Sequence, residues 1–124
     1  MQAGEFAIVT LNPNLEELRL SQVKMLYRGR ASSVNGATVR LADLPRRSEE
    51  REMFYQQLLK KSPSQMSAIW ARQSFSGKAL TPAEISEINS ASLLLWLKAN
   101  INGIAYIPFE QRPEEAYVLY HLKD

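Results

Sequence analysis

The sequence predicts an α/β fold, a single small domain over residues 1–124 with a mixed, partly parallel sheet flanked by helices. Strand-like apolar segments occupy both ends of the chain, and helix signals fill the middle. The strands are therefore joined by long crossovers, which favour parallel pairing for at least some of them. The chain has 124 residues, of which 45% are hydrophobic and 23% are charged, the usual composition of one globular domain.

The first elements follow from an apolar run and two helix signals. Phe6–Val9 is continuously apolar and ends in a Pro/Asn loop, which predicts a strand buried on both faces. Asn14 stands three residues before Glu17 and predicts a cap for a short helical turn. A second short helix is expected to begin at Ser21 and to stop at Gly29. Its inward side chains are expected to be Val23 and either Leu26 or Tyr27.

The next segment predicts a turn, a strand and a helix. Asn35-Gly36 is a turn signal, and the alternation over 37–41 predicts a half-buried strand. Ser48 precedes a helical pattern with apolar residues four apart on one face. The inward pair of that helix is expected to be either Phe54 and Leu58 or Tyr55 and Leu59.

Two Ser/Thr-Pro signals then predict two more helices. Ser62–Gln65 is a capping box with proline at the first helical position, followed by an apolar stripe that includes Trp70. Thr81–Glu84 repeats this pattern and predicts a helix with Ile85 and Ile88 inward. The polar stretch 89–92 predicts a break or a new cap before the apolar run 93–97.

Strands are predicted to return at the end of the chain. Asn102-Gly103 is a turn signal, 104–107 reads as a strand closed by Pro108, and 116–120 reads as the last strand. Trp70 and Trp96 are expected to be core residues because each lies in an apolar helical stripe.

Composition excludes several chemistries. The absence of cysteine excludes thiolate zinc sites, iron–sulfur clusters, disulfides and cysteine nucleophiles. With His121 as the single histidine, a histidine-rich metal site or a histidine-based triad is hard to build. We therefore expect no enzymatic activity, no metal and no cofactor. The formal net charge of +2 gives only a slight preference for anionic partners, and without a basic stripe interleaved with aromatics we expect no nucleic-acid partner.

The longest apolar run, 93–97, is far too short to span a bilayer, so the chain is not expected to be membrane-embedded. Residues 1–5 carry no signal peptide and run straight into the first strand. That start fits a mature exported chain with an engineered first Met, which predicts a periplasmic protein whose signal peptide has been removed.

Four segments resemble a known family in order and spacing. Leu20–Arg30 resembles the signature L-S-x-x-Q-V-x-x-I-F-x-G-K of small phosphate-binding-like proteins, which are related to the periplasmic substrate receptors of phosphate ABC importers. Arg51–Phe54 resembles R-x-x-F, Trp70–Lys78 resembles W-x-R-x-x-F-x-G-K, and Asn102–Ile107 resembles the strand P-G-A-I-G-Y-V. The resemblance implies a type 2 periplasmic-binding-protein fold and a non-enzymatic protein that binds phosphate or another small oxyanion. It also implies a membrane transporter or sensor protein as partner.

Two features depart from this family. Its importer receptors are longer and close two lobes on their ligand, so the chain would be a shortened version. The family's phosphate loop is rich in Ser, Gly and Thr, whereas the matching stretch here, Leu44–Glu50, contains no glycine.

The candidate anion site is the predicted helix start after Arg47. A helix N-terminus presents free amides to an anion, and arginine forks match phosphate or carboxylate. The expected ligand-binding residues are Ser48 as hydrogen-bond donor, Arg46, Arg47 and Arg51 as cations, and Thr10 and Asn12 across a cleft at the end of the first strand.

An alternative interpretation of the same segment remains open. Glu49 and Glu50 fill the first turn, satisfy the helix dipole and would repel a bound phosphate. The segment would then be an acid-started surface helix with its arginines in solvent. Under this alternative the chain is a ligand-free protein-interaction or regulatory module on the same fold.

Overall fold

The computed structural model describes residues 4–77 and 81–123. The helices are α1 (Leu20–Tyr27), α2 (Glu49–Leu59), α3 (Pro63–Phe75), α4 (Ser90–Ala99) and a 3-10 turn η1 (Phe109–Gln111). The strands are β1 (Phe6–Thr10), β2 (Ser33–Val34), β3 (Ala37–Thr38), β4 (Arg40–Asp43), β5 (Ala83–Glu84), β6 (Gly103–Pro108) and β7 (Tyr117–Leu122).

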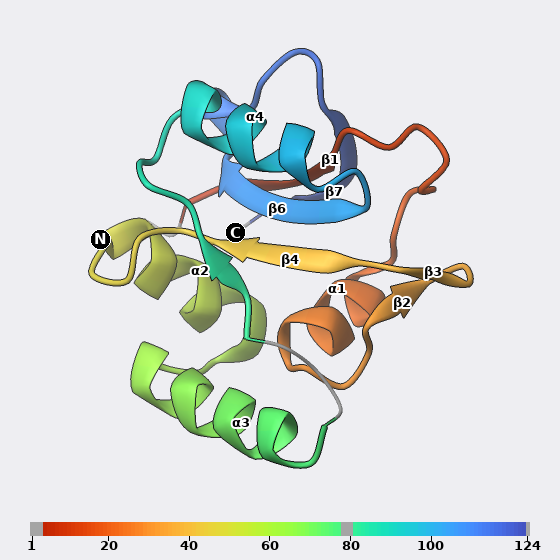
Figure 1. The fold of residues 1–124 in the computed structure, drawn as a ribbon. Coiled ribbons are helices and arrows are strands. Elements are labelled where there is room, and N and C mark those ends of the chain that lie inside the picture. The colour runs from red at the N-terminus through yellow and green to blue at the C-terminus, as the bar shows by residue number, and fades with distance from the viewer. Residues whose placement is uncertain (1–3, 78–80, 124) are drawn as a thin grey trace.

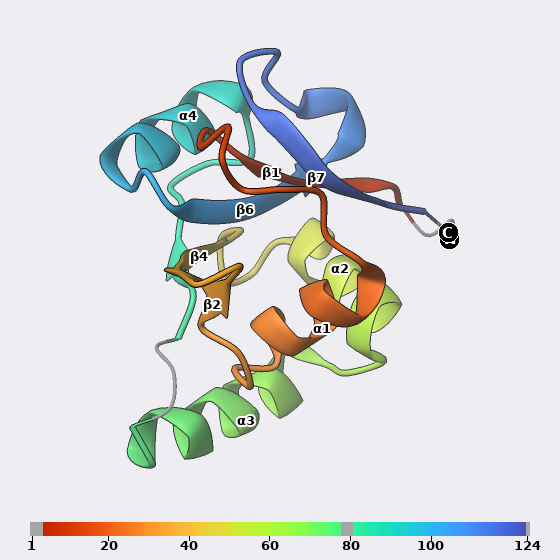
Figure 2. The same ribbon diagram turned by 90° about the vertical axis from the view of Figure 1, so that its right-hand side faces the viewer.

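One five-stranded sheet, in the order β5-β4-β6-β1-β7, forms the centre of the molecule. Helix α4 lies on one side of it, and α1, α2 and α3 lie on the other (Figures 1 and 2). β4 pairs in parallel with β5 and β6, whereas β1 pairs antiparallel with β6 and β7. The predicted α/β fold with a partly parallel sheet is confirmed.

An aromatic cluster joins the helices to the sheet. The rings of Phe54 on α2 and Tyr106 on β6 are stacked, 3.5 Å apart and within 6° of parallel. Tyr27 of α1 meets both rings edge-on. Trp70 of α3 donates from Nε1 to the carbonyl of Tyr27 at 2.8 Å, so α3 is tied to α1. The sequence left alternative inward positions open on α1 and α2, and the structure buries all of them. They are Leu26, Tyr27, Phe54, Tyr55, Leu58 and Leu59.

The predicted helical turn at Asn14 is wrong. Asn12 Oδ1 accepts from the Asn14 amide at 2.9 Å and the Asn12 carbonyl accepts from the Leu15 amide at 3.2 Å, which makes a turn. The Leu18 amide then donates to the carbonyl of Leu119 at 2.8 Å. The segment is thus held against β7 by a backbone amide that a helix would use for its own hydrogen bond.

The helix predicted from Thr81 is also wrong, because this segment forms the strand β5 and pairs with β4. Ala83 and Glu84 pair with Ala42 and Asp43, and the Ile85 amide donates to the Asp43 carbonyl at 2.9 Å. The new cap predicted in 89–92 is confirmed, since Asn89 Oδ1 accepts from the Ser92 amide at the start of α4.

The strand predicted over 37–41 is divided between two sheets. β3 forms a hairpin with β2 across Asn35 and Gly36, whose φ angles of 49° and 85° fit this tight turn. β4 joins the central sheet. At the end of α3, Gly77 has a φ of 73°, as expected for the residue after a helix, while Lys78 lies outside the described residues.

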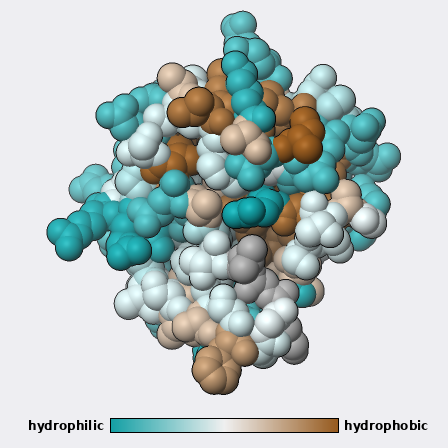
Figure 3. Space-filling model, viewed as in Figure 1, coloured by the Kyte–Doolittle hydropathy of each residue, from teal (hydrophilic) through white to brown (hydrophobic). Residues whose placement is uncertain are grey.

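Apolar side chains on the face shown in Figure 3 gather around α4. The large exposed apolar residues of α4 and the turn after it are Leu95, 73% exposed, and Ile101, 64% exposed. Trp96, expected in the core, is half-buried and packs against Gly103. Within the described ranges, no helix has the length and apolar character needed to cross a bilayer.

Candidate functional site

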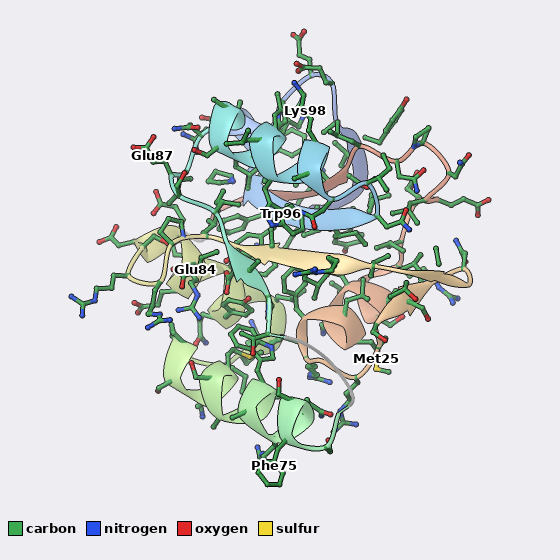
Figure 4. The ribbon with its side chains drawn as sticks, in the orientation of Figure 1. Met25, Phe75, Glu84, Glu87, Trp96 and Lys98 are labelled. Atoms are coloured by element: carbon green, nitrogen blue, oxygen red, sulfur yellow. The ribbon has the colours of Figure 1, made fainter. Side chains whose placement is uncertain are left out.

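The carboxyl ends of the parallel strands β4 and β5 meet the start of α2. Ligands of open α/β sheets bind at such strand ends. A pocket of about 330 Å³, here named the Arg51 pocket, lies at this edge. Figure 4 shows Glu84 at the end of β5 on the side where α2 begins. The pocket is lined by Asp43, Arg46, Arg51, Ser67, Trp70, Ala71, Thr81, Pro82 and Glu84.

Arg51 is the buried cation of this pocket. Its Nε donates to Asp43 Oδ2 at 3.0 Å, and its Nη1 donates to the carbonyl of Arg46 at 3.0 Å. The guanidinium carbon lies 5.6 Å from the ring centre of Tyr55 and 5.9 Å from that of Trp70. A guanidinium carries five N–H groups, and those not bonded to Asp43 or Arg46 have no partner in the described part of the chain. Arg51 is therefore held rigidly with donors to spare.

Asp43 collects the donors around it. Its two carboxyl oxygens accept from the hydroxyls of Tyr55 and Tyr106, from Arg51 and from the Leu44 amide. Burial raises the pKa of Asp43, and the hydrogen bond from Tyr106 and the charge of Arg51 only partly oppose that increase. Burial and the charge of Asp43 raise the pKa of Tyr106 well above 10, so its hydroxyl keeps its proton.

The charge of Arg51 is secured by the same carboxylate. Burial lowers the pKa of Arg51, but the negative charge and hydrogen bond of Asp43, together with Tyr55 and Tyr106, raise it, so the net pKa lies above its ordinary value. Arg51 therefore stays protonated at the pocket wall, where the carboxylate of Asp43 partly neutralises its positive charge.

The side chain of Glu84, at the end of β5, contacts the loop that leads into α2. Its Oε1 accepts from the Arg46 amide at 2.7 Å, and its Oε2 lies 3.5 Å from Arg46 Nη2. The Arg46 side chain is 78% exposed and the Glu84 side chain 42% exposed. A carboxylate of the protein therefore makes the contacts with Arg46 that a bound anion would make.

The predicted role of Ser48 as ligand donor does not fit this arrangement. Ser48 is the N-cap of α2, because its Oγ accepts from the Arg51 amide at 3.3 Å. Its one hydroxyl proton goes to the carbonyl of Pro45 at 2.8 Å. Ser48 consequently shapes the loop and fixes Arg51, and its hydroxyl has no proton left to donate to a ligand.

The start of α2 also borders a second, acidic pocket. The amides of Glu49 and Glu50 have no hydrogen-bond partner within residues 4–77 and 81–123, and Arg47 is exposed there without an ion pair. An anion at these amides would meet the carboxylates that line a pocket of about 470 Å³, those of Glu5, Glu49, Glu50 and Glu110. The anion chemistry of this edge therefore lies with Arg51 and Arg46 rather than with the first amides of α2.

Thr10 and Asn12 lie at the opposite end of the sheet. β1 runs antiparallel to β6, which is parallel to β4, so the end of β1 is level with the beginning of β4. Thr10 Oγ1 accepts from the Asn12 amide, and Asn12 Nδ2 donates to Asn102 Oδ1 at 2.6 Å, just before β6. The expectation that these residues face Ser48 across a cleft is wrong, because the sequence pattern predicts strands but not their direction.

Sequence reasoning missed the residues that hold Arg51 and Arg46 in place, which are Asp43, Tyr55, Tyr106 and Glu84. One signal was available on α2, where Arg51 stands four residues before Tyr55 and seven before Leu58 and so shares their inward face. A charged residue on an inward face needs a buried partner. Among the described residues, no group of three or more His, Asp or Glu side chains is arranged to hold a metal ion.

No protein-family model matches the chain, and no curated protein matches it. Solved structures do match. A protein assigned as a phosphate ABC transporter substrate-binding protein, with bound phosphate, from Clostridium perfringens is 18% identical, with a TM-score of 0.68 over 96% of this chain and 46% of that one. An ABC-type phosphate transport receptor from Vibrio cholerae is 13% identical, with a TM-score of 0.67 over 96% of this chain and 47% of that one. The chain thus has the fold of these binding proteins and spans about half their length.

Proposed function

We propose that the chain is a non-catalytic binding protein that takes a small oxyanion, such as phosphate, in the Arg51 pocket. The fold is that of phosphate receptors over 96% of the chain, and one of those receptors holds phosphate. The proposal extends to an exported, periplasmic protein that serves a membrane transporter or sensor, as the descriptions of these neighbours suggest.

The observation that carries the proposal is the geometry of Arg51. A guanidinium presents parallel donors that match two oxygens of a phosphate or carboxylate. Asp43 and the carbonyl of Arg46 fix its orientation, so little side-chain freedom would be lost when a ligand binds. Arg46, exposed at the same pocket, supplies a second cation.

In the free protein, the carboxylate of Glu84 takes the place of an anion at Arg46. An oxyanion would compete with this carboxylate for the amide and guanidinium of Arg46. Two unit charges about 4 Å apart repel by about 1 kcal/mol in water, which corresponds to about fivefold in affinity. We therefore expect weak binding that strengthens when Glu84 is neutralised.

A second candidate is favoured by the same contacts. If Glu84 never leaves Arg46, the pocket is closed by the chain itself, and the fold serves as a protein-interaction or regulatory module without a small ligand.

Isothermal titration with phosphate, sulfate and acetate separates the two candidates. If the ligand binds in the Arg51 pocket, the wild type binds phosphate and Glu84→Gln binds it about fivefold more tightly. Arg51→Lys keeps the positive charge but loses the forked donors, so it binds phosphate more weakly. Arg47→Gln is the control, since it removes an exposed positive charge outside the pocket. If none of these oxyanions binds the wild type or Glu84→Gln, the receptor function is rejected in favour of the second candidate.

A further inference from the structure

Positive and negative charges are segregated along the chain. Residues 18–42 and 53–83 contain nine of the 15 Lys and Arg residues and none of the 13 Asp and Glu residues. The rest of the chain holds six basic and 13 acidic residues. The net charge of +2 is therefore the sum of +9 on residues 18–42 and 53–83 and −7 on the rest. The acid-free segments include α1, the β2–β3 hairpin and α3, which lie on the same side of the central sheet (Figures 1 and 2).

A groove of about 550 Å³ lies within this positive part, where the ends of α1, α2 and α3 meet. We name it the basic groove. It is lined by Arg28, Arg30, Lys61, Ile69, Arg72, Gln73 and Ser76. No acidic residue lines it, and in residues 4–77 and 81–123 none of its four cations forms an ion pair. It shares no residue with the Arg51 pocket.

Helix dipoles account for only part of this charge. Arg28 is the C-cap of α1, Lys61 follows the C-cap of α2, and Ser76 is the C-cap of α3. Cations are favoured at helix C-termini, each of which carries about half a negative charge. Three such ends supply about one and a half negative charges, less than half of the four positive charges. The groove therefore keeps an excess of positive charge in the free protein.

We infer that the basic groove binds a multiply charged phosphate compound, one that carries two or more phosphate groups. Four cations, three of them arginines, reach the groove from the ends of α1 and α2 and from α3, and the arginine forks match phosphate oxygens. A single phosphate carries about two negative charges, half the number of cations that line the groove, so a compound with two or more phosphates is needed to pair all four. Such a ligand has two sources, a free polyphosphate or the headgroups of an anionic lipid surface. Phe75, 96% exposed at the end of α3 (Figure 4), stands beside Ser76 of the groove and would contact a lipid surface.

Titration of the whole chain with tripolyphosphate tests this inference. Arg30→Gln/Arg72→Gln removes two exposed groove cations, so the fold should be retained. Lys98→Gln/Lys123→Gln removes the same charge at exposed positions outside the groove. We expect the groove variant to bind at least tenfold more weakly than the wild type, and the control variant to bind within about twofold of it. Wild-type affinity should fall between about 50 and 200 mM salt, because the contacts are ionic.

Sedimentation with vesicles separates the two sources. Binding to phosphatidylglycerol vesicles that tripolyphosphate displaces would assign the ligand to a lipid surface, and tripolyphosphate binding without vesicle binding would assign it to a free compound. Either result supports the inference if the binding is lost in Arg30→Gln/Arg72→Gln.

Four results would overturn the inference. They are no binding to tripolyphosphate or vesicles, an equal loss in both double variants, equally tight binding of poly-glutamate, and self-association of the wild type that the groove variant abolishes. The last result would mean that the acidic part of another copy covers the groove. Because the Arg51 pocket is intact in both variants, a failure here leaves the phosphate titrations of that pocket unaffected.

Discussion

Nε of Arg51 lies 3.0 Å from Oδ2 of Asp43, and both side chains are buried where β4 meets α2. The pair joins the end of a strand to the first turn of a helix, and the hydroxyls of Tyr55 and Tyr106 complete it. Burying two charges destabilises a fold unless the charges are paired and hydrogen-bonded. Removing one partner leaves the other as a buried charge without compensation. The local fold and the candidate anion site therefore depend on the same contact.

Replacing Asp43 tests how the pair stabilises the fold. Asp43→Ala leaves Arg51 unpaired and removes the acceptor of two tyrosine hydroxyls, so we expect a loss of about 3–5 kcal/mol in the free energy of unfolding. Asp43→Asn keeps an acceptor of the same shape and should lose less, about 1–2 kcal/mol. Urea denaturation measures both. Equal losses would mean that the charge rather than the hydrogen-bond acceptor is what matters.

The pKa of Asp43 predicts an unusual pH dependence. Burial raises it in the folded chain above its ordinary value of 3.8, so the folded state holds this proton more tightly than the unfolded state does. The resulting stability is present below pH 3.8 and is lost as the pH rises through the folded pKa. The unfolding free energy of the wild type, minus that of Asp43→Asn, should therefore decrease as the pH rises above 3.8 and through the folded pKa of Asp43. An increase over this range would show that Arg51 outweighs burial.

Ser48→Ala tests the role given to the Ser48 hydroxyl. Loss of an N-cap costs about 1 kcal/mol, and Ser62→Ala at the start of α3 is a matched control, since Ser62 accepts from the Gln65 amide in the same way. Both variants should lose similar stability in thermal denaturation. Phosphate affinity should change little in either of them, whereas a specific loss in Ser48→Ala would show that this hydroxyl contacts the ligand.

Gly103→Ala tests the contact between β6 and α4. An added Cβ would lie 2.5 Å from Cζ3 of Trp96 and 2.7 Å from the carbonyl oxygen of Asn100. The backbone must then shift, and we expect a loss of about 1–3 kcal/mol in unfolding free energy. Gly36→Ala is an instructive comparison, because nothing lies near its added Cβ and the cost comes only from a φ of +85°. A negligible loss for Gly103→Ala would contradict the packing of Trp96.

Most elements could be predicted because their signals are local. The capping signal of Ser62 and Gln65 spans one turn of helix. The apolar pairs that follow Ser48 are spaced one turn apart. Thr81–Glu84 carries the same local pattern, yet Ala83 and Glu84 pair as a strand with Ala42 and Asp43, 41 residues away in sequence. A local pattern cannot reveal this kind of competition.

The candidate site could be predicted only in part for the same reason. Arg51 and Arg46 were found from their place at a helix start, and both line the pocket. Glu84 reaches Arg46 from a distant strand, and the direction of β1 moves Thr10 to the far end of the sheet. Strand direction and long-range partners are properties of the topology, which the motif order suggests but does not specify.

The most direct measurement of the central claim is anomalous diffraction from crystals soaked in tungstate, a heavy tetrahedral oxyanion. Binding in the Arg51 pocket predicts a tungsten peak whose oxygens lie within hydrogen-bond distance of the free N–H groups of Arg51, with Glu84 moved away from Arg46. A peak confined to the basic groove, or no peak in wild-type and Glu84→Gln crystals alike, would contradict it.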